Sequence, residues 1–104
     1  MRYEWDEEKN RINQRKHSGL SFELAIRVFD DPQCLITADR IDSETGEQRW
    51  HALGALAAGN SSDLLVLVVH VCRENYDGED IIRIISARAA GKYDIRRYQK
   101  QALD

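Results

Sequence analysis

Four runs in the second half of the chain have the alternating or continuous apolar character of β-strands. They span residues 34–39, 47–56, 64–73 and 80–88. The segments between them are short and rich in Gly, Asn, Asp and Ser, and they lie at residues 43–46, 57–63 and 75–79. Such connections favour hairpins. The pattern therefore predicts a four-stranded antiparallel meander.

Apolar residues at helical spacing mark the first third of the chain. Asp6 is placed to cap a helix that ends at Lys16, with acids in its first turn and bases in its last, as the helix dipole favours. Ser21 begins a second helix, which Asp31 and Pro32 end.

A last helix is predicted over about residues 89–102, and Tyr3 to Trp5 have the character of a short edge strand. Helices before and after a run of strands indicate the α+β class. A chain of 104 residues is long enough for one core, so residues 1–104 are predicted to form a single domain.

A two-residue turn at Asp77-Gly78 would fix the pairing of the last two strands. One face would then carry Val68, His70, Cys72, Arg83, Ile85 and Ala87. The other face would carry Leu67, Val69, Val71, Ile82, Ile84, Ser86 and Arg88. The second face is more apolar and is predicted to pack on the helices, with His70 lying diagonally next to Arg83 on the first.

Alternation in the strand at 47–56 places Glu47, Arg49 and His51 on one face, opposite Gln48 and Trp50. If this polar set shares a face with His70 and Arg83, a carboxylate, imidazoles and guanidiniums meet on one surface. Such groups can cleave a phosphodiester, because a base activates a 2′-hydroxyl and arginines stabilise the charge on the phosphate. Alternatively, the charges form exposed ion pairs and His70 is a core residue.

Net charge argues mildly against a dedicated nucleic-acid binder, since it is −3 with a pI near 5.6. The basic residues nevertheless gather in two segments, 9–17 and 83–100. Together these segments have the charge for a phosphate-attracting face, or they are solvated helix surfaces.

Two cysteines without a CxxC spacing indicate reduced thiols in a cytoplasmic protein. The charged N-terminus is unlike a signal peptide, and the apolar run at 64–72 is too short to span a bilayer, so no membrane association is expected. No His, Cys and Asp cluster has metal-ligand spacing, so neither a metal nor another cofactor is expected.

Three motifs resemble the BrnT toxin family. The first runs from Trp5 to Ala25 and consists of W-D-x-x-K followed by an Asn, by K-H and by S-F-x-x-A. The second is E-x-R-W at Glu47 to Trp50, and the third is R-I-I-S-A-R at Arg83 to Arg88. The resemblance implies a RelE-like fold and a toxin of a type II toxin–antitoxin system. This toxin would be a metal-independent endoribonuclease that inhibits translation.

The resemblance also implies a partner, a BrnA-like ribbon-helix-helix antitoxin that binds DNA for the complex, so the toxin would meet DNA only indirectly. A toxin–antitoxin heterotetramer is expected because such antitoxins dimerise. The alternative function is a catalytically weak binding module that sequesters antitoxin and modulates autorepression of the operon.

The family pattern assigns candidate catalytic residues at Lys16, His17, Glu47, Arg49 and Arg83. It assigns candidate RNA-binding residues at Trp50, Ser86, Arg88 and Tyr98. As a hypothesis, Glu47 or a histidine would be the general base, while Arg49, Arg83 and Lys16 would bind the phosphate.

Overall fold

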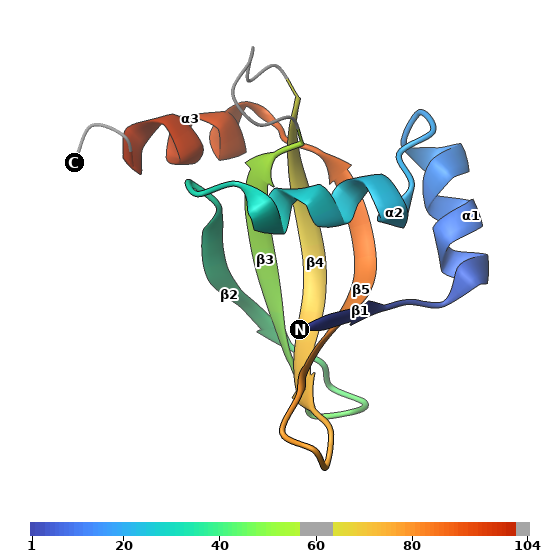
Figure 1. Cartoon of the computed structure of the whole chain (residues 1–104). Coiled ribbons are helices and arrows are strands. Elements are labelled where there is room, and N and C mark those ends of the chain that lie inside the picture. Colours follow the sequence, from blue (N-terminus) through green and yellow to red (C-terminus); the bar gives the residue numbers. More distant parts are fainter. Residues whose placement is uncertain (57–63, 102–104) are drawn as a thin grey trace.

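The computed structural model describes residues 1–56 and 64–101 as one five-stranded sheet flanked by helices (Figure 1). In chain order the elements are β1 (Arg2–Glu4), α1 (Glu7–Lys16), α2 (Phe22–Ala25), the 3₁₀ helix η1 (Ile26–Asp30), β2 (Leu35–Ile41), β3 (Gln48–Ala55), β4 (Leu65–Glu74), β5 (Asp80–Ala89) and α3 (Lys92–Gln101). The predicted connection at 57–63 and Ala102 of the predicted last helix lie outside the described residues. The α+β class is confirmed.

The prediction of a four-stranded antiparallel sheet is wrong in one respect, because the sheet is mixed and has a fifth strand. Strands β2 to β5 form the expected meander, and β1 adds to the far edge, parallel to β5, in the order β1-β5-β4-β3-β2. Tyr3 pairs with Ile82 and Glu4 with Arg83. This pairing joins residues almost 80 positions apart, so no local pattern could indicate it.

The two faces of the sheet differ in what covers them. The helix face packs under α2 and η1, whereas α3 lies across one end of the opposite face, which is called the open face below (Figure 1). Buried residues between the helices and the helix face are Leu20, Phe22, Ala25, Val28, Ala52, Leu56, Val66, Val68, Ile82, Ile84 and Ala87. This cluster therefore lies on the helix face, while Leu53, Leu67 and Val71 are buried on the opposite face.

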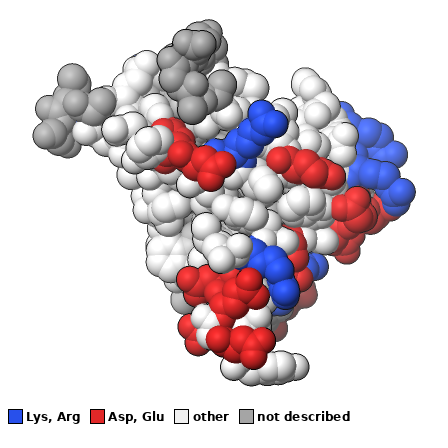
Figure 2. Space-filling model, viewed as in Figure 1, with Lys and Arg blue, Asp and Glu red and all other residues white. Residues whose placement is uncertain are grey.

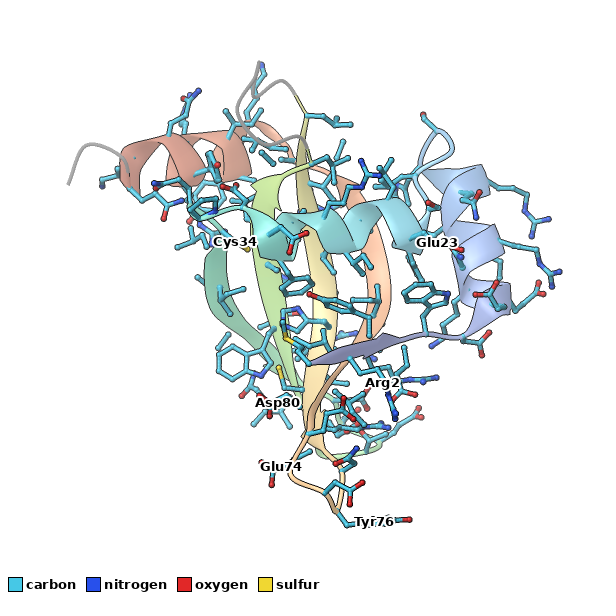
Figure 3. All side chains as sticks on the ribbon, in the orientation of Figure 1. Arg2, Glu23, Cys34, Glu74, Tyr76 and Asp80 are labelled. Carbon is cyan, nitrogen blue, oxygen red and sulfur yellow. The ribbon has the colours of Figure 1, made fainter. Side chains whose placement is uncertain are left out.

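Two buried asparagines join α1 to the rest of the fold. Asn10 accepts a hydrogen bond from the backbone N–H of Phe22 at 2.9 Å and donates to Glu23 at 2.7 Å. Figure 3 shows Glu23 at the end of α2 that lies next to α1. Asn13 donates to the carbonyl of Leu20 at 3.0 Å and accepts from the N–H of Ala87 at 3.1 Å. Asn13 therefore satisfies a strand-edge donor of β5 in a region that β1 does not reach.

The register of β4 and β5 differs from the prediction because of two irregularities, one in the hairpin tip and one in the middle of β5. The tip is a three-residue loop, Tyr76 to Gly78, in which Gly78 adopts a φ of 80°. A bulge then leaves Ile85 unpaired between Ile84, the partner of His70, and Ser86, the partner of Val69.

These two irregularities offset each other beyond the bulge, so the predicted pair of Val68 with Ala87 is confirmed. The predicted pairs of Cys72 with Arg83 and of His70 with Ile85 are wrong. A one-residue slip moves side chains to the other face. Consequently Leu67, Val69 and Val71 lie on the open face, contrary to the prediction, while Ile82 and Ile84 pack on the helices as expected.

The ends of two predicted helices also shift. The second helix continues as the 3₁₀ segment η1, and the last helix begins at Lys92 rather than Ala89 because β5 extends to Ala89. Asp94 accepts a hydrogen bond from the N–H of Gly91 at 3.0 Å and so caps the start of α3. None of the helices in the described parts of the chain is long and apolar enough to cross a membrane.

We predict that Gly54→Ala destabilises the fold by about 1–3 kcal/mol, because overpacking a tight contact forces the backbone to move. A Cβ at Gly54 would lie 2.9 Å from the carbonyl oxygen of Val28, where η1 crosses β3. Chemical denaturation measures the change. Gly91→Ala is the matched control, since its Cβ would meet nothing closer than 3.7 Å. Equal stability of the two variants would contradict the close packing of η1 on β3.

Candidate functional site

Polar side chains from three strands gather on the open face in cross-strand rows. In the first row, His51 of β3 pairs with Val69 of β4, which pairs with Ser86 of β5. In the second row, Trp50 pairs with His70, so the preceding residue, Arg49, lies beside Val71. Val71 in turn pairs with Arg83. Two strand spacings of ~4.8 Å separate Arg49 from Arg83, so both side chains can reach one ligand above Val71.

Each open-face arginine near the hairpin ends holds a carboxylate. Arg49 donates to Asp42 at 2.8 Å, and Arg83 donates to Glu4 at 3.2 Å. Arg73, in a third row, binds Glu47 through two hydrogen bonds of 2.9 and 3.1 Å. In these three ion pairs, positive and negative side chains alternate around Val71. A guanidinium has five donors, so these contacts leave N–H groups for a further anion.

Two carboxyl groups of this site, those of Glu47 and Asp42, have lowered pKa values. The hydrogen bond from Arg73 lowers the pKa of Glu47, and the charges of Arg73 and Arg83 lower it further. Backbone hydrogen bonds from Glu44 and Thr45, together with Arg49, lower the pKa of Asp42. A carboxylate with a lowered pKa is a weaker base, so Glu47 is better suited to fix Arg73 than to accept a proton.

A groove of about 210 Å³ extends the open face towards α1. Its lining includes Lys9, Lys16 and His17 of the α1 region and Ser86 of β5. The lining residues Lys9 and Lys16 give the groove its positive charge. Figure 2, viewed onto the helix face, shows blue and red side chains together over α1 and red ones gathered at the strand ends below. Three predicted site residues, Lys16, His17 and Ser86, therefore meet beside a groove of positive charge.

Three other predicted site residues lie away from these rows, and two of them make structural contacts. Arg88 donates to the buried Asp94 of α3 at 3.0 Å. The hydroxyl of Tyr98 donates to Asp31 at 2.6 Å, which ties α3 to the segment before β2. Trp50 pairs with His70 and hence lies on the helix-face side of β3. Their predicted contacts with RNA stay predictions.

The two residues that anchor α3, Tyr98 and Asp94, have shifted pKa values. Burial and the neighbouring Asp31 raise the pKa of Tyr98 to about 12, so its hydroxyl remains a donor. Burial opposes ionisation of Asp94, but hydrogen bonds from Gly91 and Arg88 outweigh it and lower the pKa. Arg88 therefore pairs with a buried carboxylate, which is a structural role for its guanidinium.

Two residues of the open face were not among the candidate catalytic and RNA-binding residues, although the sequence grouped His51 with Glu47 and Arg49 on one strand face. Arg73 follows Val69 and Val71 by strand alternation, and this periodicity could have indicated it. His51 accompanies Glu47 and Arg49 in the same alternation, but its partner could not be predicted. Nε2 of His51 lies 3.2 Å from the carboxylate of Asp39 on β2.

His70 does not join the polar residues, so the surface that would have combined it with Arg83 does not form. Its side chain is 1% exposed on the helix face, with its ring edge-to-face against Phe29 at 5.1 Å. The Nδ1 atom is buried and has no hydrogen-bond partner among the described residues. Burial lowers the pKa of His70, and the charge of His51 behind it acts in the same direction.

Histidine, cysteine and carboxylate side chains are the protein groups that bind most metal ions. Within residues 1–56 and 64–101, no group of three or more His, Cys, Asp or Glu side chains is arranged to hold a metal ion.

The fold and the site together define the class of protein, an α+β domain in which one face of the sheet is rich in arginine. The sequence model of one family, described as the ribonuclease toxin BrnT of type II toxin–antitoxin systems, matches residues 5–94. The chain therefore belongs to the BrnT toxin family. Membership implies a ribonuclease toxin with an antitoxin partner. A search of the curated proteins gave no match.

We predict that acid destabilises the wild type more than His70→Leu. The folded-state pKa of His70 is below 6.5, its ordinary value, so the unfolded chain binds more protons below about pH 6.5. The stability that neutral His70 retains at pH 7.5 is lost as the pH falls. Urea denaturation between pH 7.5 and 5.5 measures the slope. A slope that is the same in both proteins would show that burial does not disfavour the imidazolium.

Proposed function

We propose that this protein is a metal-independent endoribonuclease whose site is the open face. The observation that supports this function best is the placement of Arg49, Arg73 and Arg83 around Val71, on the same face as His51 and Ser86. Guanidiniums bind phosphate oxygens through paired hydrogen bonds and stabilise the extra charge of a pentacoordinate phosphate. RNA cleavage would block translation.

The reaction is a transfer within the RNA strand. A 2′-hydroxyl loses its proton to a base, and its oxygen forms a bond to the adjacent phosphorus. The bond from phosphorus to the 5′ oxygen breaks, and that oxygen takes a proton. The products are a 2′,3′-cyclic phosphate and a 5′-hydroxyl, and no metal is needed because arginines compensate the charge.

The groove at the end of α1 would continue the binding surface. Lys16 and His17 would bind the RNA backbone next to the arginines, since they line this groove together with Ser86 of β5. Positive charge along this path attracts a polyanion even though the chain as a whole is acidic. The proposed catalytic residues are thus Lys16, His17, Arg49 and Arg83, and Glu47 is a positioning residue that acts through Arg73.

The partner would be a BrnA-like ribbon-helix-helix antitoxin in a heterotetramer. Acidic side chains of such a partner can use the same free N–H groups of the arginines that RNA would use. Binding would then cover the open face and neutralise the toxin. DNA would be contacted by the antitoxin, so the acidic net charge of this chain is no obstacle.

We predict that the purified protein cleaves a mixed-sequence RNA in the presence of EDTA and that Arg83→Ala lowers the rate by about 10²–10³. This is the loss expected when a group that stabilises developing charge is removed. Gel electrophoresis of end-labelled RNA measures the rate. Arg27→Ala is the matched control, because Arg27 lies on η1 in the helix layer.

Three outcomes are informative. Loss of cleavage in folded Arg83→Ala and full activity in Arg27→Ala support the open face as the site. Activity that disappears on chelation contradicts metal independence. RNA that stays intact with folded wild type favours the alternative of a binding module that sequesters antitoxin.

A further inference from the structure

The structure assigns the proton-transfer step to His51, with Asp39 as the residue that positions it. Neither residue is part of the family motifs described above, and the inference rests on the proposed ribonuclease function. It names which side chain takes the proton from the 2′-hydroxyl.

The first argument is position. His51 and Ser86 lie in one row of the open face, with Val69 between them, and Arg49 is two residues from His51 on the same strand. Alternate residues of a strand are ~6.8 Å apart, so a phosphate held by Arg49 and Arg83 has its ribose within reach of His51. The imidazole is partly exposed, with 26% of the side-chain surface accessible.

The second argument is orientation. Nε2 of His51 lies 3.2 Å from the Asp39 carboxylate, so this nitrogen carries the proton and donates it to the carboxylate. The neutral ring then has its lone pair on Nδ1, which is the atom that accepts the proton. As the ring becomes positively charged, the negative charge of Asp39 stabilises it.

The third argument compares the other candidates. Glu47 is bound at both oxygens by Arg73, and the pKa of its carboxyl is lowered, so it is a weak base. His70 is buried on the opposite face. His17 lines the groove but makes no side-chain hydrogen bond within the described residues, so no partner orients its ring. An imidazole titrates near neutral pH, where a general base is most effective.

The surroundings of His51 determine how the rate depends on pH. The charged and titratable groups around it are Asp39 on β2, Arg49 on β3, Arg97 of α3, which donates to Thr37 beside His51, and His70 behind the sheet. In the step, Nδ1 of neutral His51 takes the 2′-hydroxyl proton while the oxygen attacks phosphorus, and the departing 5′ oxygen takes a proton from water. His51 then returns its proton to solvent.

The test measures cleavage of a short RNA in EDTA from pH 5.5 to 8.5 by wild type, His51→Gln, Asp39→Asn and Arg83→Ala. We expect His51→Gln to keep KM and thermal stability but to lose about 10²–10⁴ in kcat, together with the rise of rate with pH. Asp39→Asn should lower kcat with KM unchanged and alter the pH profile of cleavage, because the carboxylate that orients the ring is lost. Asp77→Asn at the exposed hairpin tip is its matched control.

Rescue separates a chemical role from a structural one. Added imidazole should restore part of the activity of folded His51→Ala and none of the activity of Arg83→Ala. If wild type cleaves, Arg83→Ala does not, and His51→Gln retains the wild-type rate and pH profile, the assignment to His51 is overturned while the proposed function stands. The same holds if His17→Gln, rather than His51→Gln, removes the rise with pH. If wild type does not cleave, both are overturned.

Discussion

The one unpaired residue in β5 determines which side chains can act together in this protein. With Ile85 left out of the pairing, Ile82, Ile84 and Ala87 all face the helices, while Arg83 and Ser86 face away from them. The buried Asn13 fixes the strand just past this bulge, because its side chain accepts a hydrogen bond from the N–H of Ala87. The core and the candidate site are therefore two consequences of one local irregularity.

The open face combines opposite charges so that it can be both stable and reactive. Every arginine of the two rows near the hairpin ends has a carboxylate partner, which keeps the guanidiniums from repelling one another in the free protein. Exposed pairs of this kind add little stability, and their N–H groups are not exhausted. An incoming phosphate can share or replace the carboxylates. The same property makes the face suitable for an acidic partner, so substrate and antitoxin would compete for it.

Much of the fold follows from local chemistry in the sequence. Asp6 and Ser21 cap α1 and the second helix as predicted, and alternation correctly places Arg49 and His51 on one face. Strand register could not be predicted, because the NYDGE segment is compatible with a two-residue or a three-residue turn. That choice moves each following side chain to the other face. The contact of His51 with Asp39 also depended on register, since β2 has its own irregularity between Ala38 and Ile41.

The most direct test of the central claim is to locate bound RNA on the protein. Nuclear magnetic resonance spectra of the ¹⁵N-labelled protein would be recorded during titration with a short RNA that carries 2′-O-methyl groups and therefore cannot be cleaved. The account predicts large shifts of the Nε–H signals of Arg49, Arg73 and Arg83, with smaller changes at Arg27 on η1. Shifts confined to the helix layer, with the three open-face arginines unchanged, would contradict it.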